Sequence, residues 1–105
     1  MSDVRMTYAT AAVLQALGEG YRYGFDIADA ARLRGGTVYP ILRRLEEAGY
    51  LSGHWEAARI SRDEGRPARR YYRLNATAEP LLATARERYP IPWIGALPEP
   101  AKGSV

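Results

Sequence analysis

Cysteine is absent from this chain of 105 residues, and histidine occurs once, at His54. The lack of cysteine excludes a disulfide framework, a thiolate nucleophile and a zinc site built on sulfur. His54 and Glu56 share one side of a predicted strand, but two ligands make a weak site, and we predict no metal. No apolar run approaches the roughly 20 residues of a membrane helix, and the first residues lack a signal peptide's apolar core. We therefore expect a soluble cytoplasmic protein.

Catalytic constellations are equally scarce. Asp26 and Asp29 lie one helical turn apart, with no general acid near them in the sequence. Gly18, Gly20 and Gly24 have the wrong spacing for a dinucleotide-binding loop, and they follow a predicted helix instead of a strand. The length suffices for one small domain with a modest core. We predict neither an enzyme nor a bound cofactor.

Positive charge is concentrated in the middle of the chain. The net charge is only +3, but residues 31–75 hold ten arginines against five acidic residues. Fourteen of the fifteen basic residues are arginine, the side chain that pairs bidentately with phosphate and with guanine edges. The location of this charge indicates an anionic partner for the central segment.

The segment from Gly35 to Tyr50 has the pattern of an amphipathic helix. Its apolar residues recur at helical spacing and would share one buried side: Val38, Ile41, Leu42 and Leu45. The opposite side carries Tyr39, Pro40, Arg43, Arg44 and Glu47. Thr37 is a candidate cap for the first turn, Pro40 is tolerated near the start, and Gly49 ends the helix. The polar side suits a DNA groove.

Two helices are predicted before this segment. Residues 4–17 form the first, which Gly18 and Gly20 end. Residues 25–31 form a short second helix with Phe25, Ile27 and Ala28 facing the interior. A glycine-containing turn then leads into the helix that starts at Gly35, so the pair is a helix-turn-helix candidate.

A hairpin and a last helix are predicted after it. Residues 51–60 alternate as a strand, residues 61–67 form a polar turn-rich loop, and residues 69–74 form a second strand. We interpret Trp55, Tyr71 and Tyr72 as core residues and cross-strand pairs, in preference to a stacking surface for single-stranded nucleic acid. Asn75 is a candidate N-cap for a helix that runs to about Tyr89.

This order of elements predicts a mostly helical α+β fold: a winged helix-turn-helix domain of three helices and a two-stranded β-wing, followed by a short C-terminal helix. We expect the DNA-binding domain to span residues 1–75 and the C-terminal helix, a candidate for dimerisation, residues 76–89. The proline-rich tail, residues 90–105, should be extended or disordered. The positive charge falls on the third helix and the hairpin, the parts that contact DNA in this architecture.

Three motifs occur in order along the chain: YGFDI at Tyr23–Ile27, GTVYPILRRL at Gly36–Leu45 and EGRPARRYYRL at Glu64–Leu74. Together they resemble the PadR family of bacterial transcriptional regulators, over about residues 8–82. The resemblance implies a dimeric winged-helix repressor, with the third helix in the major groove and the wing over the backbone. It also implies that the subunits join through the first and last helices. The chain departs from the family in its LNATA segment, which lacks a glycine, and in the shortness of its last helix.

From the charge pattern and the resemblance we predict DNA contacts by Gly36, Thr37, Tyr39, Pro40, Arg43, Arg44, Arg62, Arg66 and Arg69. Arg43 is the candidate for a base edge and Arg44 for phosphate. The competing interpretation is a solvated helix side on which Arg43 pairs with Glu47. Trp93 is a candidate effector contact, and its alternative role is a clamp that pins the tail to the body or to the other subunit.

The predicted function is sequence-specific regulation of transcription. We expect a homodimeric repressor that binds an inverted-repeat operator in double-stranded DNA and responds to an effector, if any, of unknown identity. One alternative is an architectural or recombination-directing DNA-binding protein of a phage or mobile element. Another is a winged-helix module for protein association without DNA binding. Both retain the same fold.

Overall fold

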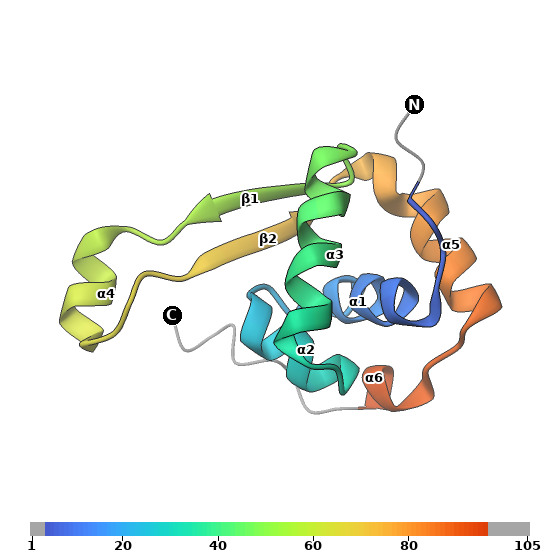
Figure 1. Cartoon of the computed structure of the whole chain (residues 1–105), viewed down its shortest axis with the longest axis horizontal. Helices are drawn as coiled ribbons and strands as arrows, with labels where there is room; N and C mark the ends of the chain where they lie inside the picture. Colours follow the sequence, from blue (N-terminus) through green and yellow to red (C-terminus); the bar gives the residue numbers. More distant parts are fainter. Residues whose placement is uncertain (1–3, 97–105) are drawn as a thin grey trace.

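The computed structural model describes residues 4–96, which form one body with a projecting hairpin (Figure 1). The helices are α1 (Tyr8–Gly18), α2 (Gly24–Ala31), α3 (Gly35–Glu47), α4 (Ala58–Glu64), α5 (Glu79–Arg88) and α6 (Pro92–Ala96), with a 3-10 turn over Ala76–Ala78. The strands are β1 (Leu51–Trp55) and β2 (Arg70–Leu74). Within residues 4–96 no helix is long and apolar enough to cross a membrane.

Helix α1 lies at the centre of the core. Thr7 caps its first turn by accepting a hydrogen bond from the Thr10 amide at 3.1 Å, so the helix begins later than predicted. Every residue from Thr10 to Leu17 is buried, because α2, α3 and α5 all pack against α1. The apolar side of α3 closes the same core as predicted, with Val38, Ile41, Leu42 and Leu45 buried.

The buried amide of Gln15 joins α1 to the C-terminal segments. Its Nε2 donates to the carbonyls of Ala11, Ala85 and Tyr89 at 3.2, 3.4 and 2.8 Å. Its Oε1 accepts from the Ile91 amide at 3.3 Å. A buried amide is tolerated only when its donors and acceptor are satisfied, as they are here. Gln15 therefore fixes α5 and the chain after it against α1.

The wing is the antiparallel hairpin of β1 and β2, with a register from Leu51↔Leu74 to Trp55↔Arg70. The pairing continues one step further, where the Glu56 amide donates to the Arg69 carbonyl at 2.8 Å. Beyond it the chain forms α4, so the strand predicted to Ile60 and the loop predicted from Ser61 are wrong there. Backbone groups without a partner strand are satisfied within a helix, and alanine, arginine and glutamate favour one.

Two aromatic side chains predicted in the interior lie at the surface. Phe25 is 68% exposed and Trp55 is 63% exposed. Helix α2 turns Ile27, Ala30 and Ala31 inward, and Phe25 lies about 200° around the helix from Ile27. Trp55 belongs to the last strand pair of the wing, beyond the edge of the core.

The segment after β2 differs from the sequence prediction in two ways. The predicted single helix is a 3-10 turn followed by α5, in which Pro80 occupies the first turn, where its missing N–H costs nothing. An extended tail was expected from residue 90, but Pro92 opens α6, and Ile91 and Ile94 are buried against Ala12 and Ala31. The tail prediction is therefore wrong for α6, and its remainder, residues 97–105, lies outside the described residues.

Candidate nucleic-acid interface

The outer side of α3 carries the side chains predicted to contact DNA. Its exposed residues are Gly36, Thr37, Tyr39, Arg43, Arg44 and Glu47, with Pro40 half-buried among them. Arg34 is the N-cap and Thr37 lies within the first turn, so the predicted cap is wrong. Within residues 4–96 neither Arg43 nor Arg44 forms an ion pair, and the alternative pairing of Arg43 with Glu47 is not formed. Both guanidinium groups are available to a ligand.

Tyr39 is positioned by a close approach between α2 and α3. Its ring lies against Gly24, where a Cβ atom would come within 2.3 Å of Cε1 and 2.4 Å of the hydroxyl. Only glycine leaves room for this ring, which explains the glycine of the YGFDI motif. Tyr39 remains 51% exposed, so its ring packs on α2 while its outer surface belongs to the candidate interface.

An ion pair fixes the wing relative to α3. Arg70 Nη2 of β2 lies 2.7 Å from Glu46 Oε2 of α3. Gly53 makes room for the pair, because a Cβ there would lie 2.8 Å from Arg70 Nη2 and 2.9 Å from Glu46 Oε2. The Arg70 guanidinium also lies 5.4 Å from the centre of the Trp55 ring. Arg70 therefore orients the wing from within the protein.

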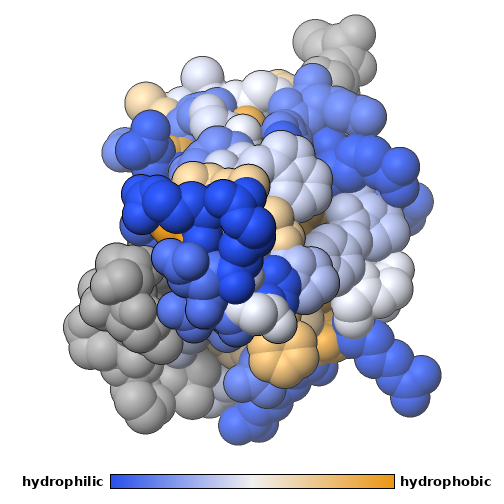
Figure 2. All heavy atoms as spheres, turned by 90° about the vertical axis from the view of Figure 1, so that its left-hand side faces the viewer, coloured by the Kyte–Doolittle hydropathy of each residue, from blue (hydrophilic) through white to orange (hydrophobic). Residues whose placement is uncertain are grey.

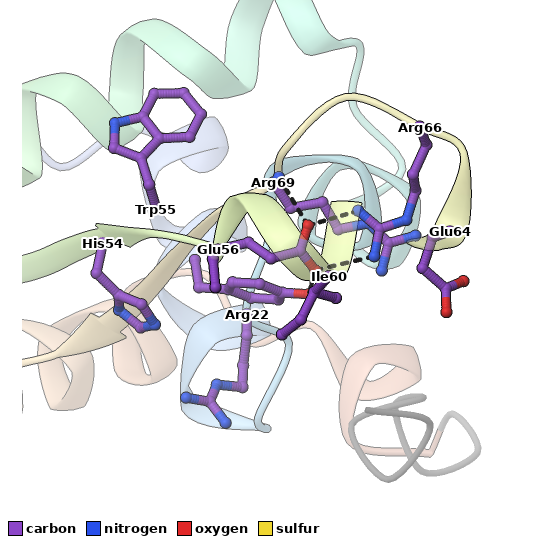
Figure 3. Close-up of a pocket in the computed structure, with 10 residues that line it drawn as sticks. Arg22, His54, Trp55, Glu56, Ile60, Glu64, Arg66 and Arg69 are labelled. Carbon is purple, nitrogen blue, oxygen red and sulfur yellow. Dashed lines mark hydrogen bonds and ion pairs between the residues drawn. The ribbon is translucent and has the colours of Figure 1, made fainter. Parts of the chain in front are cut away.

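A second ion pair holds the outer end of the wing (Figure 3). Arg66 binds the Glu56 carboxylate with two nitrogens, at 2.7 and 2.9 Å. The Arg69 amide and the Tyr71 hydroxyl donate to the same carboxylate at 3.2 and 3.4 Å. The Glu56 side chain is 4% exposed. The Arg66 hydrogen bonds are the main reason that the pKa of Glu56 falls from its ordinary 4.5 to about 2.

Arg69 joins the wing to the connection between α1 and α2. Its guanidinium lies over the Tyr23 ring at 4.2 Å, and that ring meets Tyr71 edge to face at 5.9 Å. The Arg22 carbonyl accepts a hydrogen bond from the Tyr72 amide at 2.7 Å. The predicted contact residues Arg66 and Arg69 are thus both engaged inside the protein.

Two arginines of α4 remain exposed at the wing tip. Arg59 and Arg62 are exposed, and within the described residues neither forms an ion pair. Figure 2, which views the molecule from the wing end, shows a strongly hydrophilic surface there. Arg62 belongs to the predicted set, whereas Arg59 was missed because the sequence predicts a strand at that position. The helix propensity of residues 58–64 is the sequence signal that could have placed Arg59 on an exposed helix.

Trp93 of α6 is held against the C-terminal end of α2. Its Nε1 donates to the Ala30 carbonyl at 3.2 Å, and the Arg32 guanidinium lies 4.6 Å from the ring centre. Arg32 is the left-handed residue that ends α2, with φ 57°. This contact matches the alternative role of a clamp on the body. A role in effector binding stays a prediction.

The family model of the transcriptional regulator PadR-like family matches residues 13–83, from α1 through the wing into α5. The chain belongs to the PadR-like family of transcriptional regulators. Together with the observed helices and wing, the match confirms the mostly helical winged helix-turn-helix fold predicted from the sequence. No curated protein matches this PadR-like chain in sequence.

Solved structures share the fold. A PadR family transcription regulator from Clostridium difficile R20291 superposes with a TM-score of 0.64 at 23% identity, over 77% of this chain and 85% of that one. The smu.1704 protein of Streptococcus mutans UA159 gives 0.58 at 28% identity, over 80% and 79%. Wild-type ZitR of Lactococcus lactis, in complex with DNA, gives 0.58 at 22% identity. The PadR-like chain aligns over 83% of its own length but spans only 57% of ZitR.

Proposed function

We propose that this PadR-like regulator acts by binding double-stranded DNA at a specific operator. The observation that carries the proposal is the outer side of α3, where Tyr39, Arg43 and Arg44 are exposed beside the basic wing. A helix of this width fits the major groove, and an adjoining wing reaches the flanking backbone. The ZitR structure, which contains DNA, is one relative of similar fold that supports this use.

Each exposed group has a proposed role. Arg43 reads a base edge, and Arg44 and Tyr39 bind phosphate. Gly36, Thr37 and Pro40 form the start of α3 that approaches the backbone. At the wing we assign phosphate or minor-groove contact to Arg59 and Arg62. We retain Arg66 and Arg69 as contacts of lesser weight, because Glu56 and Tyr23 hold them.

We further propose that the chain represses transcription in the cytoplasm as a homodimer. Helices α1 and α5, with the residues just before α1, supply a candidate surface. Tyr8 of α1 is 44% exposed, and Met6 before α1 and Leu81 and Leu82 of α5 are only half-buried. A twofold dimer would bind an inverted repeat with half-sites about one helical turn, or a multiple of one turn, apart. Sedimentation equilibrium of the purified protein tests the dimer, and a monomer at micromolar concentration would contradict it.

Fluorescence anisotropy at several salt concentrations tests DNA binding, with an operator selected from genomic fragments. Each neutralised phosphate should contribute about −0.9 to the slope of log K against log salt. A slope near zero excludes the proposal. Arg43→Ala should lower discrimination between operator and random DNA by about tenfold or more, since a good base contact is worth about 1–3 kcal/mol. Normal discrimination by this variant would show that Arg43 is not the base reader.

A further inference from the structure

A cavity of about 540 Å³ lies beneath the wing, between α4 and the connection of α1 with α2 (Figure 3). His54 of β1, Tyr71 of β2, Ile60 of α4 and Arg22 of the connection all line it. Figure 3 shows His54 and Arg22 projecting to one side of the hairpin and Trp55, which also lines the cavity, to the other.

Of the two acidic residues that line the cavity, Glu56 is already neutralised. Glu56 accepts two hydrogen bonds from Arg66, one from the Arg69 amide and one from the Tyr71 hydroxyl. Its low pKa, about 2, keeps it charged and paired at neutral pH. Glu56 and Arg66 therefore form a wall of the cavity in which the Glu56 carboxylate is fully paired.

The other walls suit a flat apolar ring. His54 and Tyr71 stack with their planes 29° apart and their centres 5.8 Å apart, which gives a broad aromatic surface. Ile60 is 38% exposed on α4, although a branched apolar side chain gains nothing from contact with water. A ring placed between Ile60 and the His54–Tyr71 pair would cover both surfaces.

The charge at the rim favours an anion. Arg22 is exposed and, within the described residues, forms no ion pair. Arg69 adds a second guanidinium, and Glu64 is the acid that faces them. With Glu56 and Arg66 cancelling each other, the remaining side chains carry one net positive charge.

We propose that this cavity, the wing pocket, binds a small planar aromatic anion. The ring lies between Ile60 and the stacked His54–Tyr71 pair, and the anionic group binds the Arg22 guanidinium. Recognition needs both parts of the ligand, because the walls supply apolar contact and the rim supplies charge. The proposal does not depend on DNA binding, and the test uses the protein alone.

The probe is 1-anilinonaphthalene-8-sulfonate, an aromatic anion that becomes fluorescent in apolar surroundings. Titration of the folded protein should show saturable binding at one site per chain. The neutral analogue N-phenyl-1-naphthylamine, which keeps the rings and lacks the sulfonate, should bind about tenfold more weakly because it forgoes a charged hydrogen bond. Binding without saturation, or equal affinity for the two probes, would overturn the proposal.

Two charge-matched variants locate the site. Arg22→Gln should lower sulfonate affinity by about tenfold and leave the neutral probe unchanged. Arg73→Gln removes the same charge from β2, at an exposed position outside the pocket, and should stay within about twofold. Ile60→Glu, at an exposed position, should weaken both probes. Thermal unfolding and circular dichroism confirm that each variant is folded. Equal losses for Arg22→Gln and Arg73→Gln would show general attraction to a basic surface and would contradict binding in the wing pocket.

Discussion

Gly24 sets how closely α2 and α3 approach, because the Tyr39 ring occupies the space that a side chain at residue 24 would fill. Gly24→Ala should lower the free energy of unfolding by about 1–3 kcal/mol, the usual cost of overpacking. It should also weaken operator binding, because the Tyr39 ring must move. Urea denaturation and anisotropy measure the two effects.

Gly36→Ala provides the matched control for stability. A Cβ at Gly36 has nothing within 4 Å, so alanine should be neutral or gain about 0.4–1 kcal/mol from its lower backbone entropy in the unfolded chain. If Gly24→Ala is as stable as the wild type, the contact between Tyr39 and Gly24 does not hold the helices in place.

Glu56 should make stability depend on pH in the acidic range. Its folded pKa of about 2 lies below its ordinary value of 4.5, so the unfolded chain binds more protons between these limits. Stability from Glu56 is fully present above about pH 5 and is lost as the pH falls toward 2. Glu56→Gln should be less stable than the wild type at pH 6, with the difference shrinking by pH 3. A constant difference in urea midpoints would contradict the pairing with Arg66.

The candidate site was predictable from the sequence as a region but not as a set of free side chains. Helical spacing placed Arg43 and Arg44 opposite the apolar residues of α3, and both are exposed. Arg66 and Arg70 have partners 10 and 24 residues away, at Glu56 and Glu46. Such pairs depend on the register of the hairpin and on its angle to α3, which composition does not encode.

Among the elements, α4 shows where pattern reasoning fails. Residues 51–60 alternate well enough for a strand, yet only Leu51–Trp55 find a partner in β2. Helices α2 and α3 and both strands were recognisable, because the apolar residues of each recur in the sequence at the spacing of a helix or of a strand. Gly65, with φ +67°, ends α4 in a left-handed turn. The sequence predicted only a turn in that region.

The wing tip should contribute nonspecific affinity. Arg62→Ala should weaken binding to operator and random DNA alike and reduce the salt slope by about 0.9. Arg59→Ala should behave in the same way, and the double variant should lose about twice as much slope. Arg73→Ala, an exposed arginine of β2 outside the predicted contacts, is the control. Unchanged slopes in the α4 variants would remove α4 from the interface.

In the molecule as a whole, the C-terminal segments are bound to the core by hydrogen bonds that the sequence pattern does not predict. Gln15 looks like an ordinary polar position of α1, yet it is buried and bonds α5 and the chain after it. Trp93 ties α6 to the end of α2. Neither tie follows from helical periodicity, because each depends on segments more than 60 residues apart.

The two tryptophans should therefore differ in their effect on stability. Trp93→Ala should cost about 1–3 kcal/mol, since it removes a hydrogen bond and a half-buried ring. Trp55→Ala should stay within about 0.5 kcal/mol, because that ring is mostly exposed. Chemical denaturation of the two variants side by side decides this. Equal losses would mean that α6 is not a structural part of the fold.

The ion pair of Glu46 and Arg70 holds α3 and the wing at one angle to each other. Gly53 leaves room for the pair, and a wider angle between α3 and the wing would separate Arg70 from Glu46. If α3 reads bases and the wing binds the backbone, as proposed above, one base pair added between these contacts, about 3.4 Å, would exceed the span of the protein. The DNA would have to bend or twist to compensate. Operator choice would therefore depend on how easily the untouched steps between the two contacts deform.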